Sequence, residues 1–473
     1  MDQQASKFLE AAAAAIQDTE HAVYREALGK SLPDLRDKAV KEFGGAPRFA
    51  ALRQHVKKIR QHSLRYLGHY LERFVQQARE NGNHVHFASN GDELNSIVLD
   101  ICLRREATRV AKGKSMITEE TGLNAILENA GIAVRETDLG EYIIQTAGET
   151  PSHIIGPALH KTEAEIRELF LEQHQLGDRG LDNVEELVAE ARQMLRDDFL
   201  EADIGIIGSN ALIAENGYSM LVTNEGNGDL CANLPQTLII CTSVDRVLPR
   251  TRDAMAMLRL LARSTTGQAV SCYTSFYSGP KSAADLDGPQ ETHIVLLDNG
   301  RSEVLASDYQ EMLQCIRCGA CLNHCPVYMS AGGHAYGSVY PGPMGSVLTP
   351  LLGSLEDSAL LPNACTACGR CEEVCPAAIP LPDLLRDLRA EQFSQRITAP
   401  RWRLGLRMHA WLVLRPRLYR WTTGIAVRLM HFLGGREGVL RRLPFASGWL
   451  EARDLPAPAS RSFMQWHERH HRP

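Results

Sequence analysis

The spacing of apolar residues divides the first 300 residues into two patterns. Asn81-Gly82-Asn83 interrupts the chain between them. Beyond this break, short apolar segments alternate with amphipathic ones as far as residue 300, which predicts an α/β layer structure. Before it, apolar residues recur at steps of three and four, which predicts helices, as at Phe49, Leu52, Val56, Ile59, Leu64, Leu67 and Leu71.

Individual elements can be predicted within the α/β part. Helices are expected at 92–106 and 118–130, after Thr162, which can form a capping box with Glu165, and after Asn183. Asn299-Gly300 predicts a turn at the end of the α/β part, and Ser307 with Gln310 predicts the cap of a short helix leading to Cys315. Strands are expected at 84–88, 132–136, 204–207, 220–222, 238–244 and 293–297.

Composition is that of an ordinary globular protein. The 473 residues are 44% hydrophobic and 23% charged, and their number predicts two or three folded units. The first residues lack the basic region and cleavage site of an export signal. The most apolar stretches, 204–214 and 234–244, are shorter than the roughly 18 residues of a spanning helix. We therefore expect a cytoplasmic protein whose thiols stay reduced.

Charge separates a C-terminal segment from the rest. Residues 401–442 carry ten arginines against one acid, Glu437, a net charge of +9, so the remainder must carry −15 to give the total of −6. All five tryptophans lie beyond residue 400. Such a segment suits an acidic protein partner, the acidic remainder of this chain, or peripheral contact with the inner face of an anionic membrane. Pro416 interrupts a continuous amphipathic face and favours protein contact. Nucleic-acid binding is not predicted because the chain is acidic and has no recognition motif.

Eight of the twelve cysteines form two copies of one motif, C-x2-C-x2-C-x3-C-P. The remaining four, Cys102, Cys231, Cys241 and Cys272, are predicted to be buried small hydrophobic residues. The first copy contains Cys315, Cys318, Cys321 and Cys325 before Pro326, and the second contains Cys365, Cys368, Cys371 and Cys375 before Pro376.

This spacing is typical of proteins with two [4Fe–4S] clusters. Three thiolates of each motif bind one iron–sulfur cube, and the fourth binds the cube of the other motif. Structural zinc is the alternative, but eight thiols in two compact motifs that end in proline favour cubes. The predicted ligands of the first cube are Cys315, Cys318, Cys321 and Cys375, and those of the second are Cys365, Cys368, Cys371 and Cys325.

Cubes with cysteine at every corner have no open iron for a substrate, so we expect them to pass single electrons. Arg317 and Arg370 stand beside the ligands, where they either raise the cluster potentials or form ordinary surface cations. Gly319 and Gly369 stand between ligands, where a small residue lets the backbone approach a cube.

Two further groups of residues are candidates for chemistry, although the sequence identifies no catalytic residue. The turns at 205–217 and 223–227 follow strands and are rich in small and amide residues, so they either cradle an anion on backbone amides or serve as structural turns. An acidic set either acts in acid–base chemistry or cation binding, or forms a solvated or helix-capping face: Glu119, Glu120, Glu136, Asp138 and Glu141.

Six sequence strings, beside both cysteine motifs, resemble the lactate utilization iron–sulfur proteins of the LutB type, and the resemblance covers nearly the whole chain. The strings are Lys114-Ser-Met-Ile-Thr-Glu-Glu, Glu136-Thr-Asp-Leu-Gly-Glu-Tyr, Leu221-Val-Thr-Asn-Glu-Gly-Asn, Asp298-Asn-Gly-Arg-Ser-Glu-Val-Leu-Ala-Ser, Gly332-Gly-His-Ala-Tyr-Gly-Ser-Val-Tyr-Pro-Gly-Pro and Glu451-Ala-Arg-Asp-Leu-Pro.

The resemblance implies an α/β LUD domain, similar to sugar isomerase and CoA-transferase-like proteins, then an α-helical dicluster ferredoxin domain and a helical C-terminal region. With the residue patterns it predicts an N-terminal helical segment at 1–80, the LUD domain at 81–300, the dicluster domain at 301–395 and the basic, tryptophan-bearing region at 396–473.

The implied role is electron transfer in a multi-component system that oxidises L-lactate to pyruvate. The implied partners are a cysteine-rich iron–sulfur protein and a second LUD protein. The alternative is that the LUD domain is itself an enzyme that acts on a small acid or its activated derivative, with the clusters as its redox relay.

Overall fold

The computed structural model describes residues 7–441 and 454–470. The chain forms two compact units, Met1–Gln392 and Phe393–Pro473, and each is described by itself. Trp449 and the first three residues of the string that begins at Glu451 lie outside the described residues.

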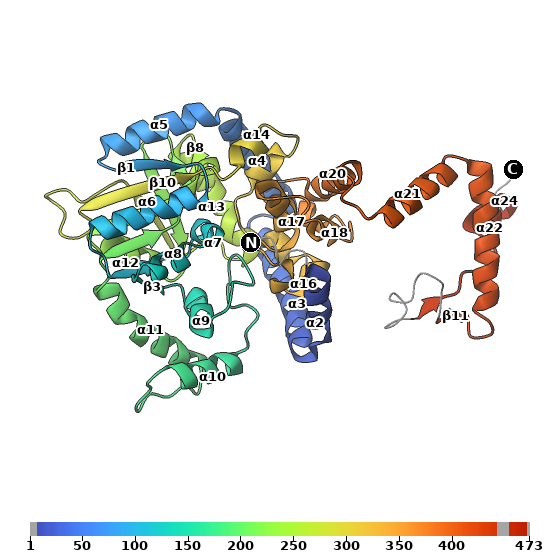
Figure 1. Cartoon of the computed structure of the whole chain (residues 1–473), viewed down its shortest axis with the longest axis horizontal. Coiled ribbons are helices and arrows are strands. Elements are labelled where there is room, and N and C mark those ends of the chain that lie inside the picture. Colours follow the sequence, from blue (N-terminus) through green and yellow to red (C-terminus); the bar gives the residue numbers. More distant parts are fainter. Residues whose placement is uncertain (1–6, 442–453, 471–473) are drawn as a thin grey trace. The chain divides into compact units, whose positions relative to one another are not determined.

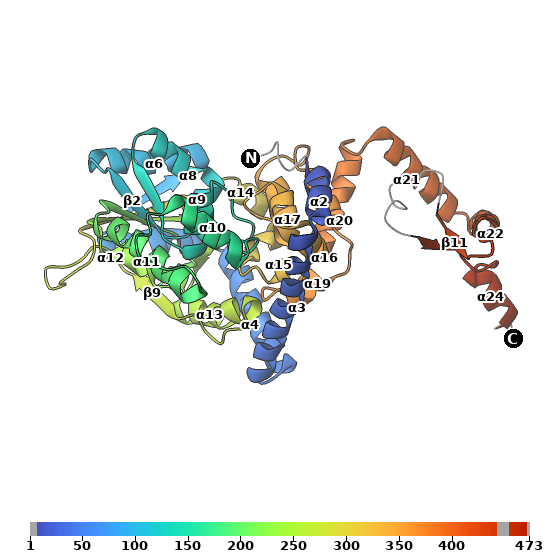
Figure 2. The same cartoon turned by 90° about the horizontal axis from the view of Figure 1, so that it is seen from below.

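The first unit is built around a six-stranded parallel sheet (Figures 1 and 2), as the alternating pattern predicts. Its inner strands are apolar on both sides because helices cover both faces. The helices α6 (Gly91–Arg104) and α8 (Leu123–Asn129) pack on one face, and α5 (Leu67–Glu80) and α12 (Asn227–Asn233) on the other. In spatial order the strands are β1 (His84–Ala88), β10 (Glu291–Leu297), β7 (Thr237–Ser243), β4 (Ile204–Ile207), β2 (Arg109–Lys112) and β3 (Ala133–Glu136).

A second sheet of four strands lies in the same unit. Its apolar side chains share a core with α4 (Ala46–Arg65) and α13 (Thr251–Thr265), and this core extends to Ile316, Cys318 and Val374 in the cysteine motifs. In spatial order the strands are β8 (Val247–Leu248), β5 (Ala211–Ile213), β6 (Tyr218–Thr223) and β9 (Tyr273–Tyr277).

Helix boundaries follow the predicted signals in most places. The capping box of Thr162 and Glu165 is formed at the start of α10 (Glu163–Gln173), and Asn183 caps α11 (Val184–Leu200). The helix predicted at 118–130 is instead two helices, α7 (Met116–Thr121) and α8, because Gly122 adopts φ of +67° between them. The remaining helices before the cysteine motifs are α2 (Phe8–Gln17), α3 (Thr19–Glu42), α9 (Leu139–Ala147), the 3₁₀ helix η1 (Val244–Arg246) and α14 (Arg301–Leu305).

Short helices make up the region of the cysteine motifs. Their core contains Tyr336, Leu361 and Leu385, and also Phe8 and Ala12 of α2, so the N-terminal helices belong to this region as much as to the α/β part. The elements are η2 (Gln310–Gln314), α15 (Ala320–Asn323), α16 (Pro326–Ala331), η3 (His334–Tyr336), α17 (Gly342–Leu352), α18 (Leu360–Asn363), α19 (Arg370–Val374) and α20 (Leu381–Ser394).

Two further predictions, on Cys272 and Ser307, are wrong. Cys102, Cys231 and Cys241 are buried as expected, but Cys272 is exposed because it lies in a loop before the edge strand β9. Ser307 does not cap a helix with Gln310: the element is the 3₁₀ helix η2, whose N-cap is Tyr309 and has no side-chain cap. The Ser307 hydroxyl accepts a hydrogen bond from the Tyr309 backbone N–H instead.

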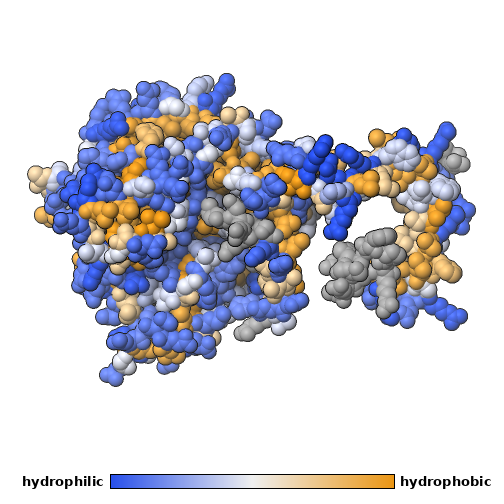
Figure 3. Space-filling view, viewed as in Figure 1, coloured by the Kyte–Doolittle hydropathy of each residue, from blue (hydrophilic) through white to orange (hydrophobic). Residues whose placement is uncertain are grey.

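The second unit contains three described helices and one short two-stranded ribbon. Pro416 is the first residue of α22 (Pro416–Leu433), so the basic segment is split into this helix and α21 (Pro400–Val413). Large exposed side chains such as Trp402, Trp411 and Phe432 stand among the arginines of the two helices. Figure 3 shows hydrophobic and hydrophilic residues interspersed over this unit. Among the described helices, none has the length and apolar content of a membrane span. The other elements are β11 (Val439–Leu440), β12 (Leu455–Pro456) and α24 (Phe463–His470).

Candidate functional site

The two cysteine motifs fold into loops with the same backbone. The third residue of each motif, Arg317 or Ala367, has φ of +57° or +55°, and its N–H donates to the sulfur of the motif's first cysteine at 3.4 or 3.3 Å. The residue after the second cysteine has φ of +78° in both motifs. Glycine adopts this left-handed backbone most easily, which explains why Gly319 and Gly369 occupy these positions. Each loop thus turns its backbone N–H groups toward its own sulfurs.

Cys375, the last cysteine of the second motif, lies with the first motif. One small cavity is lined by four cysteines from the two motifs, together with Ile154, Met344 and Ile379. These cysteines are Cys315, Cys318, Cys321 and Cys375. This is the group of four that the spacing predicts for the first cube.

The other four thiols also lie near one another. Burial, and then the neighbouring thiols of Cys325, Cys365 and Cys368, raise the pKa of Cys371 to about 12. Burial likewise raises the pKa of Cys321 well above its ordinary value, with a smaller contribution from Cys371. Cys325 of the first motif therefore lies near thiols of the second motif, and Cys371 lies near the first group.

These residues fit two iron–sulfur cubes. Without a metal, burial raises the pKa of both Cys325 and Cys375 to about 11, so their thiolates need a bound cation to balance the charge. A cube supplies that charge with a separate iron for each thiolate. Across residues 7–441 and 454–470, no three His, Cys, Asp or Glu side chains converge tightly enough to hold a single metal ion.

Side chains of helix α4 donate hydrogen bonds to backbone carbonyls in or beside both cysteine motifs. Arg53 Nε donates to the oxygen of Cys375 at 2.8 Å, and Lys57 Nζ donates to that of Ala378 at 3.0 Å. One turn later, Arg60 Nη2 donates to the oxygen of Leu313 at 2.6 Å, just before the first motif. A single helix thus holds the segments that carry Cys315 and Cys375 in place.

Beside the first motif lies a buried cluster of four arginines and two acids, which we call the arginine network: Arg60, Arg246, Arg301, Arg317, Asp245 and Glu120. Asp245 is its centre, with Oδ atoms 3.7, 3.6 and 3.3 Å from nitrogens of Arg60, Arg246 and Arg301. Burial would raise the pKa of Asp245, but the surrounding arginines hold it far below its ordinary value. Two acids therefore face four cations.

Glu120 joins the α/β part to the region of the cysteine motifs. Its carboxylate receives two hydrogen bonds from Arg301, at 2.7 and 3.0 Å, and one from the Tyr340 hydroxyl at 2.5 Å. The guanidinium of Arg317 lies 4.3 Å from the centre of the Tyr340 ring. Its Nε and Nη1 atoms are buried, so Arg317 is no surface cation, whereas Arg370 is partly exposed and pairs with Glu373 at 2.8 Å.

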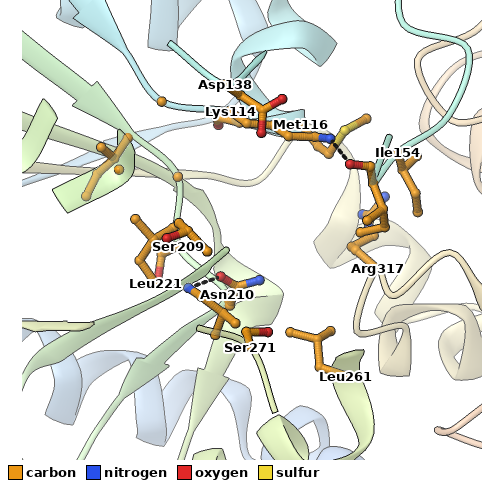
Figure 4. Close-up of a pocket in the computed structure, with 18 of the residues that line it drawn as sticks. Lys114, Met116, Asp138, Ile154, Ser209, Asn210, Leu221, Leu261, Ser271 and Arg317 are labelled. Atoms are coloured by element: carbon orange, nitrogen blue, oxygen red, sulfur yellow. Dashed lines mark hydrogen bonds between the residues drawn. The ribbon is translucent and has the colours of Figure 1, made fainter. Parts of the chain in front are cut away.

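A cavity of about 260 Å³ lies where the carboxyl ends of β2, β4 and β7 meet the first cysteine motif (Figure 4). Both turns singled out in the sequence line it, through Ser209 and Asn210 from the first and Thr223 and Glu225 from the second. Its opposite wall comes from Ile316, Arg317 and Cys318. The fold thus joins the candidate anion-binding turns to the loop of the first predicted cube.

Most of the acidic set is buried, so the prediction of a solvated face is wrong for those residues. Glu136 and Glu119 both pair with the buried Lys112. Asp138 caps α9 by accepting from the N–H groups of Gly140 and Glu141, as the capping alternative predicts. Of the set, Asp138 is the member that lines the cavity.

Glu141 makes folding pH-dependent. Burial, and then the charge of Glu136, raises its pKa to about 8. The folded state therefore holds a proton that the unfolded state releases near pH 4.5, and stability should fall as pH rises from about 5 to 8, by up to about 1.4 kcal/mol per unit. In Glu141→Gln this slope should be shallower in urea denaturation at several pH values. An unchanged slope would show that Glu141 is ionised in the folded protein.

Comparisons with known proteins agree with this two-part architecture. A family model described as LUD domain matches residues 71–297, and one described as 4Fe-4S dicluster domain matches residues 311–379. With eight thiols at 315–375, the second match shows that the cofactors are two [4Fe–4S] clusters. A crystal structure of a DUF162 family protein from Deinococcus radiodurans aligns with 49% of this chain and 98% of its own, at 12% identity and a TM-score of 0.28.

Relatives match over almost the full length. "Uncharacterized electron transport protein YkgF" of Escherichia coli (strain K12) is 40% identical, covering 96% of this chain and 95% of its own. "Lactate utilization protein B" of Geobacillus sp. (strain WCH70) is 40% identical over 92% and 91%, and that of Lysinibacillus sphaericus (strain C3-41) is 42% identical over 88% and 87%. The chain therefore belongs to the family of Lactate utilization protein B.

Proposed function

We propose that this protein is the iron–sulfur electron-transfer subunit of a multi-component system that oxidises L-lactate to pyruvate. The observation that carries the proposal is the grouping of eight thiols into two adjoining sets, each with three cysteines from one motif and one from the other. The names of the relatives support lactate as the substrate of this system.

In this proposal Cys315, Cys318, Cys321 and Cys375 hold the first cube, and Cys365, Cys368, Cys371 and Cys325 hold the second. Every corner then has a cysteine, so the clusters relay single electrons and bind no substrate. The first set is largely buried, whereas Cys368 is exposed. Exchange with a protein partner therefore takes place on the side of the second cube, because electron transfer needs close approach.

The partners that we propose are a cysteine-rich iron–sulfur protein and a second LUD protein. Helices α21 and α22 supply a surface for such contact, since they expose both arginines and large apolar side chains. We infer a protein partner with an acidic surface rather than a membrane, because Pro416 breaks the continuous face that membrane binding favours. Sedimentation with anionic vesicles in the absence of partners would contradict this choice.

The proposal is tested by metal and sulfide analysis. Protein purified without oxygen should contain about eight irons and about eight acid-labile sulfides per chain, as two cubes require. Adding L-lactate together with the partner proteins should reduce these clusters, as measured by EPR spectroscopy. A preparation that contains zinc and no iron, or clusters that stay oxidised with lactate and all partners, would refute the proposal.

A further inference from the structure

The cavity beside the first cysteine motif contains buried polar atoms that lack a hydrogen-bond partner among the described residues. They are Nε and Nη1 of Arg317 and the Oγ1 atoms of Thr223 and Thr242. Thr242 is 1% exposed, and it stands near the carboxyl end of β7. Buried donors of this kind are rare in folded proteins because each one left unpaired costs free energy. Four such atoms from residues that line one cavity leave hydrogen-bonding capacity there for a ligand.

The charges indicate the sign of that ligand. In the arginine network four cations face two acids, and Arg246 and Arg317 of that network line the cavity. The acids that line the cavity, Asp138 and Glu225, lie toward Lys114, whose charge offsets one of theirs. The end of the cavity beside Arg317 therefore has an excess of positive charge, which favours an anion.

The remaining walls limit the size and polarity of the ligand. Apolar side chains line the space between the two ends, among them Ile207, Leu221 and Leu261. Figure 4 shows Lys114 at the top of the cavity and Leu261 near the bottom, with Leu221 and Arg317 on facing sides. An acid with a short carbon chain matches these walls, with its charged group at Arg317.

We propose that this cavity binds a small 2-hydroxy or 2-oxo carboxylic acid, with its carboxylate on the guanidinium of Arg317 and an oxygen within reach of Thr242. A guanidinium donates charge-assisted hydrogen bonds to a carboxylate, so the unpaired Nε and Nη1 of Arg317 provide donors for this group. The choice of a hydroxy or oxo acid rests on the proposed function, whereas the anion site rests on the cavity alone. The bound acid would lie beside the loop of Cys318.

The excess positive charge has a second explanation, which is the negative charge of the cube and its thiolates. Arg317 stands between two predicted ligands, and the matching position of the other motif is Ala367, which has no charge. Replacing Arg317 alone would therefore not distinguish binding of the ligand from balancing of the cube's charge. Thr242 has no charge, so its hydroxyl tests the ligand without changing the field at the cube.

Isothermal titration calorimetry on the anaerobically purified full chain tests the inference. Pyruvate, L-lactate and inorganic phosphate are titrated separately into protein of measured iron content. We expect one molecule of pyruvate or L-lactate to bind per chain, Arg317→Gln to weaken binding by about tenfold or more and Thr242→Val by about threefold or more, in line with the loss of one charged and one neutral hydrogen bond. The matched control, Arg370→Gln, should bind as the unchanged protein does.

Saturating pyruvate should also change the EPR spectrum of the reduced first cube in the unchanged protein. Failure of either acid to bind at about 10 mM, in protein with about eight irons, would overturn the inference and leave the electron-transfer role intact. Binding of phosphate alone would overturn the choice of a carboxylic acid. Binding that Thr242→Val and Arg317→Gln both leave unchanged would show that the acid binds elsewhere.

Discussion

Cys375→Ser is expected to remove the first cube and leave the second, although residue 375 belongs to the second motif. The reason is that its thiol lies with Cys315, Cys318 and Cys321 around one cavity. Iron content should fall from about eight to about four per chain, because a cube with three cysteine ligands is easily lost. Iron analysis and EPR spectroscopy of the reduced protein measure both effects.

Three further variants make this test specific. The EPR spectrum of Cys375→Ser should match that of Cys318→Ser, which loses a ligand of the same set, and should differ from that of Cys371→Ser. Cys272→Ser is the control, because this cysteine is exposed and lies outside both motifs. A match between Cys375→Ser and Cys371→Ser would mean that each motif holds its own cube, and the crossed assignment would be wrong.

Glu120→Gln should destabilise the first unit by about 3–5 kcal/mol, since it removes the charge of the acid that lies closest to the buried Arg301. Glu120 pairs with Arg301 at 2.7 Å, and both side chains are almost fully buried. With its charge removed, Asp245 would be the single acid facing four arginines. Thermal and urea denaturation followed by circular dichroism measure the loss.

The matched control is Glu26→Gln, which removes the same charge from a surface pair. Glu26 and Lys30 are 69% and 72% exposed, so solvent screens their ion pair and its loss should change stability far less. Similar losses in the two variants would show that the arginine network does not stabilise the fold. Tyr340→Phe should give a smaller loss than Glu120→Gln, because it removes one neutral donor.

The sequence predicts five of the six strands of the parallel sheet. Strands β1 and β4 have the predicted bounds, and β3, β6, β7 and β10 differ from prediction by one or two residues. Strand β2 is missed because its two apolar residues stand between Arg109 and Lys112, and β9 is missed because it lacks aliphatic residues. Strands β5 and β8, with three and two residues, show no periodicity and are also missed. Neither could be separated from a loop without its neighbours in the sheet.

The site was predictable only in part, for a similar reason. Motif spacing gives the eight thiols because the ligands of a cube repeat at fixed short intervals. In contrast, the arginine network joins residues that are far apart in the sequence, the first at position 60 and the last at position 317. Their pairing depends on the packed fold. The two turns are recognisable as candidates, but nothing local shows that they meet Arg317 across one cavity.

The packing of the first helices limits how this protein can be divided. Phe8 lies against Tyr336 with ring centres 5.1 Å apart, and Arg53 holds the backbone at Cys375. A fragment that starts near residue 300 would retain every thiol but lose part of its own interior. The region of the cysteine motifs is therefore not an independently folding unit. Recombination or gene fusion could transfer it intact only together with the N-terminal helices.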